Sequence, residues 1–477
     1  MDLGEPNVHQ YYWVVVASGI LAIFAAFGIG ANDVANAFAT SVGSGALTIK
    51  QAIFIAAIFE FLGSVLMGGH VVNTIRKGIS KVECFEDRPD ILMYGSMNVI
   101  IAVGLWLITA SRFEIPVSTT HSAVGGMIGM TLTAVGSKCV NWSETSTTFP
   151  YQSGVSAIII SWILSPVLSG LCASALFFCV RKILRTQNPY ENIWKFYPLL
   201  IGVTVTINSF FILWKGFKNA SDQIDKLSIE VVMGISFGVG LFSSILSLPL
   251  IRKWKKETRV LEKSDKICDV NNLNIRNCST EDILALDEKA CNVHENAELF
   301  DKRAEEGLKK LQIFTSICDS FAHGANDVAN AIGPFAAVYM TYKHNGVSKN
   351  ADMGNDSYWI LSIGGIGIVL GLLLYGYKII QAIGMKLSKI TPSRGICIEL
   401  GSAIIVITGS RYGWPLSTTH CQVGATVAVA LMEGRNGLNW TIFYKICIGW
   451  ILTLVIVGGT TALFFAQGIY SPSIHEF

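Results

Sequence analysis

The sequence predicts an all-α, multi-pass membrane protein made of two inverted-topology repeats with discontinuous or re-entrant helices. Three observations support this fold class: an apolar composition, apolar stretches long enough to span a membrane, and a polar motif that occurs twice. Of the 477 residues, 51% are hydrophobic and only 15% are charged, whereas soluble domains carry about 25% charged residues. The composition therefore excludes a disordered chain, a disulfide scaffold and an ordinary soluble enzyme.

The apolar stretches divide into full spans and shorter pieces. A helix needs about 20 apolar residues to cross a bilayer. Two shorter stretches, residues 116–135 and 415–432, begin at a proline and are rich in Gly and Thr, so we expect broken or re-entrant helices there. Together with the longer stretches they predict about 10–12 transmembrane segments. The candidate spans are residues 11–30, 51–73, 91–110, 153–180, 196–216, 229–251, 311–340, 358–383, 396–408 and 441–466.

A charged segment divides the membrane part into two halves. Residues 252–310 hold 26 of the 70 charged residues and no long apolar run, which is typical of a solvated connector. We therefore predict an N-terminal membrane half (1–251), a charged loop (252–310) and a C-terminal membrane half (311–477). Dense basic clusters at 181–185 and 252–259 place this loop in the cytoplasm by the positive-inside rule. We expect the N-terminus outside and the protein in the plasma membrane.

The remaining composition indicates few additional partners. The eleven cysteines are scattered without a C-x-x-C pair, so we expect neither a disulfide framework nor a metal site built from cysteines. The net charge of +2 leaves no basic excess for nucleic acid.

Two motifs occur once in each half. GANDVANA spans 30–37 and recurs without change at 324–331. The stretches 108–121 and 407–420, ITASRFEIPVSTTH and ITGSRYGWPLSTTH, are identical at nine of fourteen positions. Two many-helix halves that share polar interruptions are typical of secondary transporters, whose site lies between the repeats near the membrane midplane.

The GANDVANA copies predict a cation site. An Asp at the centre of a bilayer costs about 2.5–3.5 kcal/mol, so these acids and amides must satisfy one another, an ion or a substrate. Gly30 and Gly324 permit unwinding, which would free carbonyl oxygens beside the hard oxygen ligands that suit Na⁺. The alternative is a structural role, in which these polar side chains only bond neighbouring helices to one another. The predicted cation-binding residues are Asn32, Asp33, Asn36, Asn326, Asp327 and Asn330.

The Ser-Thr-Thr-His copies predict an anion site. Pro116 and Pro415 suit the first turn of a helix. Hydroxyls and free N–H groups at two helix N-termini can bind a tetrahedral oxyanion such as phosphate or sulfate. A pair of ordinary helix caps is the alternative. The predicted substrate-binding residues are Ser118, Thr119, Thr120, Ser417, Thr418 and Thr419, with Asp33 and Asp327.

Several other polar residues lie in apolar surroundings. Glu60 and Glu399 are lone acids that could bind a cation or proton, or make hydrogen bonds between helices. For His121 and His420 we favour donation to neighbouring carbonyl groups over a proton relay. His323 precedes only the second GANDVANA copy and Ile29 stands in the first, so a symmetric role is excluded.

On these motifs, the chain resembles the PiT class of inorganic phosphate transporters over essentially its whole membrane part. The resemblance implies an inverted-repeat fold of about twelve segments, phosphate uptake driven by Na⁺ or H⁺, a cytoplasmic central loop and, in many members, a homodimer. No cofactor is expected beyond the coupling ion. The family's acidic residues match Asp33, Asp327, Glu60 and Glu399, its hydroxyls match the two Ser-Thr-Thr sets, and its histidine matches His323. Glu60, Glu399 and His323 are thereby candidate coupling residues.

The favoured hypothesis is import of inorganic phosphate through the lipid bilayer by symport with a cation, preferably Na⁺. A proton-coupled phosphate permease or a sulfate or other oxyanion permease on the same fold is the nearest alternative. An intramembrane aspartyl protease is a further alternative, although the G-x-G-D pattern is missing, so we expect no enzyme. A transceptor or viral receptor is a third class, and it would survive mutation of Asp33.

Overall fold

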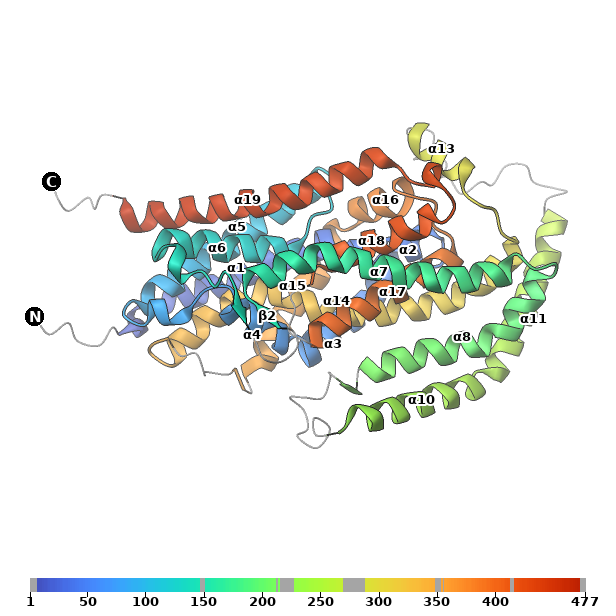
Figure 1. Ribbon diagram of the computed structural model, residues 1–477, viewed down its shortest axis with the longest axis horizontal. Coiled ribbons are helices and arrows are strands. Elements are labelled where there is room, and N and C mark those ends of the chain that lie inside the picture. The colour runs from blue at the N-terminus through green and yellow to red at the C-terminus, as the bar shows by residue number, and fades with distance from the viewer. Residues whose placement is uncertain are drawn as a thin grey trace, which may run out of the picture.

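Long helices that run along one axis make up most of the chain (Figure 1). The computed structural model describes residues 7–145, 151–211, 213–214, 227–268, 288–347, 353–354, 356–411 and 416–471. Within them, eight stretches are long and apolar enough to cross a membrane, which confirms a mostly helical, multi-pass membrane protein. These stretches are Val8–Val34 with α1 (Tyr12–Ile29), α3 (Ile49–Met67), α5 (Pro89–Arg112), α7 (Val155–Leu184), α10 (Ile229–Leu246), α15 (Asp356–Tyr375), α17 (Pro392–Arg411) up to Gly409, and α19 (Trp440–Tyr470).

Two further predicted spans are helical where the structure describes them: residues 196–211 lie in α8 (Pro189–Phe211), and residues 311–340 lie in α14 (Lys302–Lys343). At 42 residues, α14 is about 63 Å long and exceeds the thickness of a bilayer. The remaining helices are α2 (Ala35–Gly43), α4 (Gly69–Gly78), α6 (Thr119–Ala134), α8 (Pro189–Phe211), α11 (Leu248–Cys268), α13 (Glu288–Asn296), α14 (Lys302–Lys343), α16 (Tyr377–Lys386) and α18 (Thr418–Leu431). Shorter elements are η1 (Val8–Tyr11), η2 (Gly30–Val34), η3 (Val82–Phe85), η4 (Ser137–Cys139), η6 (Arg435–Gly437), β1 (Glu144–Thr145) and β2 (Gln152–Ser153).

Three predicted spans are interrupted rather than continuous. The stretch 51–73 breaks at Gly68 between α3 and α4, and 358–383 breaks at Gly376 between α15 and α16. The stretch 229–251 divides at Ser247 between α10 and α11. A Cβ atom on Gly68 would lie 2.5 Å from a methyl carbon of Val328, so the first break coincides with a close approach to α14.

The two sequence halves interleave in one core. α3 packs along α14 and α15 packs along α1, so each half supplies a partner for the other. In the same way α19 packs on α6, and α18 packs on α7. Buried apolar side chains of both halves form one continuous cluster. The halves are therefore units of sequence that fold around a shared interior.

The bundle has two distinct ends (Figure 1). The start of α1 and the end of α19 lie at one end, together with the loops that follow α4 and α6. We call this the terminal end. The helices α11 and α13 lie at the opposite end, which we call the charged-segment end.

The charged segment 252–310 contains helices at both of its ends. α11 continues from α10 to Cys268, and α13 precedes the start of α14. Residues 269–287 lie outside the described residues. Glu298, between α13 and α14, pairs with Arg181 at 2.7 Å and with Arg185 at 2.6 Å. This clasp fixes the last part of the segment against the end of α7.

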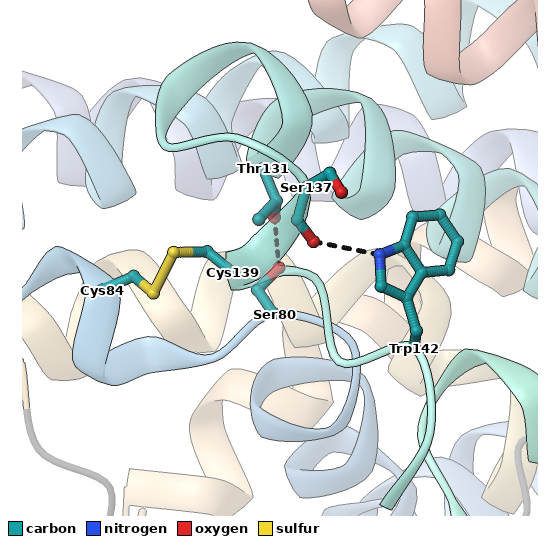
Figure 2. Close-up of a disulfide and its surroundings, with 6 residues drawn as sticks. All are labelled: Ser80, Cys84, Thr131, Ser137, Cys139 and Trp142. Atoms are coloured by element: carbon teal, nitrogen blue, oxygen red, sulfur yellow. Dashed lines mark hydrogen bonds between the residues drawn. A yellow bond between two sulfur atoms is a disulfide. The ribbon is translucent and has the colours of Figure 1, made fainter.

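The expectation of no disulfide is wrong in one place. Cys84 and Cys139 are bonded to each other, with Cα atoms 6.1 Å apart and a sequence separation of 55. Figure 2 shows this bond joining the loop before α5 to the turn after α6. Backbone hydrogen bonding from Lys81 to Cys139 at 2.8 Å holds the same two segments together. The pairing can be identified only from the fold, because scattered cysteines in a sequence do not reveal their connectivity.

Candidate functional site

Two helices begin inside the bundle at the repeated Ser-Thr-Thr-His motifs. α6 and α18 start at Thr119 and Thr418, and the serine before each helix has an extended backbone conformation. Ser118 and Ser417 are buried and cap these helices, because each Oγ accepts a hydrogen bond from the backbone N–H three residues later, at 3.2 and 3.3 Å. The cap interpretation is therefore correct for the serines. It leaves two helix N-termini in the interior, where they favour an anion.

The threonines of both motifs donate to the two aspartates. Thr119 donates to Asp33 at 2.7 Å, and Thr419 of the other repeat donates to the second oxygen of Asp33. Thr418 donates to Asp327 at 2.7 Å. All five side chains are buried. Because Asp33 accepts donors from both repeats, the two pairs of motifs form a single site.

The second GANDVANA copy reaches across to the first repeat. The amide of Asn330 lies 2.9 Å from Thr119 Oγ1 and 3.3 Å from Thr120 Oγ1. The amide of Asn326 donates to Asp327 at 2.9 Å and to the carbonyl group of Leu416 at 3.1 Å. These predicted residues therefore lie together at the interface of the repeats.

Asn32 holds the extended chain that precedes α6. Its amide donates to the carbonyl group of Ile115 and to Ser111, both at 3.0 Å, and its oxygen accepts from the N–H of Val117 at 2.9 Å. Asn32 thus positions the start of the Ser-Thr-Thr motif. The side chain of Asn36 lies outside the described part of the chain.

The predicted unwinding is found in neither copy, and the two copies differ in helix type. The first copy contains the π-helical segment η2, which is wider than an α-helix and common at functional sites. The second copy lies within the continuous helix α14, so unwinding at Gly324 is wrong. A Cβ on Gly324 would lie 2.2 Å from the carbonyl oxygen of Glu60, and one on Gly30 would lie 1.8 Å from that of Ile368. Both glycines therefore allow close helix packing.

His323 lies between two carboxylates. Its Nδ1 is 3.2 Å from Glu60, and its Nε2 is 2.8 Å from Asp327. Asp33, His323 and Asp327 each offer a ligand atom, and these atoms lie within 4.8 Å of one another. The structure thus brings Glu60 and His323 to the site. It does so asymmetrically, since the first copy has Ile29 in the place of His323.

Glu399 lies apart from the aspartates. Its carboxylate accepts hydrogen bonds from Thr40 at 2.7 Å, Ser41 at 2.6 Å and Gln312 at 3.2 Å, and also from Thr315. None of these partners belongs to the predicted substrate or cation set. Glu399 therefore forms a second buried polar cluster between α2, α14 and α17.

His121 and His420 each contact both Trp162 and Trp450. His121 Nδ1 lies 3.2 Å from the carbonyl oxygen of Trp450, and His420 Nδ1 lies 3.0 Å from that of Trp162. Each ring also packs at 3.7 Å on the indole of the other tryptophan. The prediction that these histidines donate to carbonyl groups is confirmed. The pair fastens α6 and α18 to α7 and α19.

Asp319 is a buried acid that the duplicated motifs do not reveal. It lies four residues before His323 and eight before Asp327, so all three face the same side of α14. The repeated spacing of four is the signal in the sequence that could have found it. Sequence reasoning missed Asp319 because this residue lies outside both motifs.

The chain is similar to known phosphate transporters. A profile of the phosphate transporter family matches residues 29–461. The chain is 32% identical to the chloroplastic inorganic phosphate transporter 2-1 of Arabidopsis thaliana, over 97% of this chain and 73% of that protein. It is 27% identical to sodium-dependent phosphate transporter 1 of Mus musculus, over 97% and 96% of the two chains.

A solved structure shows the same fold. It is described as the sodium-dependent phosphate transporter, and it superposes with a TM-score of 0.77 at 33% identity. The match covers 96% of this chain and all of the other. Transporters of this kind are not enzymes, which removes the protease alternative. The chain belongs to the phosphate transporter family.

Proposed function

We propose that the protein imports inorganic phosphate by symport with Na⁺ at the interface of its two repeats. The observation that supports this best is the environment of Asp33, a buried carboxylate between Thr119 of one repeat and Thr419 of the other. These two threonines lie in the first turns of α6 and α18. The arrangement supplies hydrogen-bond donors for an oxyanion. It also supplies a carboxylate that can accept a hydrogen bond from a protonated oxyanion or bind its counter-ion.

Phosphate binding requires an exchange of hydrogen bonds. A hydroxyl group has one proton, so Thr119 and Thr419 must turn away from Asp33 to donate to a phosphate oxygen. The freed carboxylate then accepts a hydrogen bond from the P–OH group or coordinates Na⁺. Sulfate carries no such proton at neutral pH, so this contact discriminates against it. The proposed substrate contacts are Ser118, Thr119, Thr120, Ser417, Thr418, Thr419, Asp33 and Asp327.

Na⁺ is proposed to bind beside the phosphate. The oxygens of the asparagines and aspartates are hard ligands of the kind that coordinate Na⁺, and Asp33 and Asp327 approach each other closely enough to share a cation. A cation offsets the cost of an anion in low dielectric, so each improves the affinity of the other. The proposed ligands are Asn32, Asp33, Asn36, Asn326, Asp327 and Asn330.

Glu60 and His323 are proposed to take part in coupling. The imidazole of His323 contacts both Glu60 and Asp327, which is also the arrangement of a proton relay. This contact is the specific observation that favours proton coupling as the second candidate. Glu399, in its separate cluster, is proposed to act nearer the charged-segment end.

The two ends of the bundle support an orientation. The disulfide lies at the terminal end, and disulfides persist in oxidising compartments. The basic clusters lie at the charged-segment end, which suits the cytoplasm. We therefore propose a plasma-membrane protein with an external N-terminus and a cytoplasmic charged segment. We also propose that it assembles as a homodimer, which the resemblance in sequence implies.

The directions of α6 and α18 support an inverted repeat. α6 leads to Cys139 at the terminal end, whereas α18 leads to Glu433, which accepts from the N–H of Glu298 at the charged-segment end. Equivalent helices thus run in opposite senses. This geometry allows one half to close toward each side of the membrane in turn.

Uptake of ³²P-phosphate into proteoliposomes tests the proposal. We expect uptake that requires an inward Na⁺ gradient, resists excess sulfate and disappears in Asp33→Asn. The matched control is Asp90→Asn, which removes a carboxylate that pairs with exposed Arg88 at 2.8 Å. Uptake driven by a proton gradient alone would reassign the coupling ion. Absence of uptake under both gradients in well-folded protein would contradict phosphate transport.

A further inference from the structure

The helices α8 and α10 form a pair at one edge of the bundle, and α11 continues from α10 at the charged-segment end (Figure 1). Only 17% of the span in α10 is buried, the smallest share among the eight described spans. Most of this helix therefore faces the surrounding lipid. Its exposed apolar side chains continue into the first turn of α11, and the last of them are Phe242, Ile245, Leu246, Leu248 and Leu250.

Basic side chains follow these apolar ones directly. Arg252, Lys253 and Lys256 of α11 are all exposed. Arg252 lies six residues after Leu246, about 9 Å along a helix, and Lys256 lies about 6 Å further on. The headgroup layer on each side of a bilayer is about 5–8 Å thick. The three bases therefore lie at the depth of the headgroups when the apolar side chains contact acyl chains.

Lys195 of α8 extends the same surface. On α8, Pro198 accepts a hydrogen bond from Ser244 of α10 at 2.7 Å. Glu191, also on α8, pairs with Lys255 of α11. Lys195 lies four residues after Glu191 and three before Pro198, so it is on the face of α8 that meets α10 and α11. Lys195 is nevertheless exposed, which places its charge beside the start of α11.

These four exposed bases have few acidic partners. We call them the basic surface: Lys195, Arg252, Lys253 and Lys256. In the part of the chain that the structure describes, three of them make no hydrogen bond or ion pair. The exception is Lys253, which lies 4.0 Å from Glu257 in a pair whose side chains are 72% and 50% exposed, and such pairs contribute little. The nearby carboxylate of Glu191 is already paired with two other bases.

The combination of an apolar belt and an unneutralised basic surface fits a lipid. Clusters of basic residues immediately beyond a membrane span attract anionic headgroups. A headgroup with one negative charge can neutralise one of the four bases, whereas a headgroup with several phosphate groups can neutralise more of them. Acyl chains attached to that headgroup would cover the apolar side chains beneath, which a free anion cannot do.

We propose that the basic surface binds an anionic lipid whose headgroup carries more than one phosphate group, on the cytoplasmic side in the orientation proposed above. The lipid bridges α8 and α11. The hydroxyl group of Tyr197 in α8 donates to the carbonyl group of Gly307 in α14 at 3.1 Å, so the lipid also supports the contact of α8 with the helix that carries Asp327. This inference goes beyond phosphate transport and does not depend on the coupling ion.

Native mass spectrometry of the purified full-length protein tests the proposal, with phosphatidylinositol 4,5-bisphosphate, phosphatidylserine and phosphatidylcholine as probes. Wild type should bind the bisphosphate lipid at least about tenfold more tightly than phosphatidylserine. The double variant Arg252→Gln with Lys256→Gln should weaken this binding by about 30-fold. The matched control, Lys81→Gln with Lys138→Gln, removes the same charge from exposed positions at the terminal end and should bind as wild type does.

Three further measurements keep the test decisive. Arg252→Lys with Lys256→Arg keeps the charge and should bind as wild type does. Lys195→Gln should weaken binding by about fivefold, and it gives a separate result from α8 if the α11 variant aggregates. The bisphosphate lipid should raise the unfolding temperature of wild type and leave that of the Arg252→Gln, Lys256→Gln variant unchanged.

Several outcomes would overturn the proposal. Equal affinity of wild type and the glutamine variants for the bisphosphate lipid would remove the basic surface as its site. An equal loss in the terminal-end control would show unspecific charge attraction. Inositol 1,4,5-trisphosphate that binds as tightly as the lipid would identify a soluble anion as the ligand, and phosphatidylserine that binds as tightly would refute the need for several phosphate groups. Each of these outcomes leaves phosphate symport intact.

Discussion

Thr419 donates a hydrogen bond to Asp33 although 386 residues separate them in sequence. Thr119, from the same repeat as Asp33, donates to the other oxygen of that carboxylate at 2.7 Å. The acid of the second GANDVANA copy has different partners, because Asp327 accepts a hydrogen bond from Thr418 and contacts the imidazole of His323. The repeats are therefore equivalent in sequence and unequal at their acids, which makes one asymmetric site.

Replacing Thr419 by valine should impair transport. The variant keeps the shape of the side chain and removes the hydroxyl that donates to Asp33 in the free protein and to a phosphate oxygen in the proposed complex, and a hydrogen bond to a charged group contributes about 1.5–3 kcal/mol. We expect kcat/KM for phosphate uptake to fall by about 10- to 100-fold, with Thr419→Ser close to wild type. Thr109→Val, at an exposed position on α5, is the control. Wild-type uptake by Thr419→Val would show that this contact plays no part in transport.

Gly324→Ala should destabilise the fold. The added Cβ would lie 2.2 Å from the carbonyl oxygen of Glu60, so α3 and α14 must move apart. Overpacking of this kind costs about 1–3 kcal/mol. Thermal unfolding of purified protein measures it. Gly238→Ala, where nothing lies within 4 Å, should unfold at or above the wild-type temperature, and equal unfolding temperatures for the two variants would refute the packing role.

Removing the Cys84–Cys139 bond should lower stability by about 2–4 kcal/mol, because the bond restricts the unfolded chain. The double variant Cys84→Ser with Cys139→Ser tests this by thermal unfolding, and Cys179→Ser, at an exposed free cysteine, is the control. The same bond reports orientation. After mild reduction of intact cells, an impermeant maleimide should label Cys84, and labelling only after permeabilisation would reverse the proposed topology.

The clasp at Glu298 should make stability depend on pH. Burial alone raises the pKa of Glu298, but hydrogen bonds from Arg185 and Arg181 outweigh it and lower the pKa below its usual range. A lowered pKa stabilises the fold above the ordinary Glu value of about 4.3, and the effect is lost as the pH falls through the folded-state pKa. The difference in unfolding temperature between wild type and Glu298→Gln should therefore be constant near neutrality and shrink in acid. A difference that does not change with pH would contradict the charge pairing.

The fold class could be predicted because membrane spans and duplicated motifs are local features of the sequence. The residues at the aspartate site were also predictable, since a polar cluster in an apolar stretch needs a reason to be there. The role of each single residue within the site was not predictable. Ser118 caps a helix whereas Thr119 donates to Asp33, and only the rotation of the helix decides which hydroxyl faces Asp33.

The errors come from contacts between distant segments. Gly324 looked like a place to unwind, but the backbone of Glu60 needs the space that a Cβ would fill. The Cys84–Cys139 pair and the partners of Glu399 depend in the same way on which helices become neighbours. No window of sequence contains that information.

The two repeats together build one substrate site, and equilibrium binding of ³²P-phosphate to purified protein in saturating Na⁺ tests this most directly. Wild type, Asp33→Asn and Asp327→Asn are compared at equal active concentration. We predict one phosphate per chain in wild type and loss of binding in either variant. Two phosphates per chain, or one retained when a single aspartate is replaced, would contradict a shared site and indicate that each repeat binds its own.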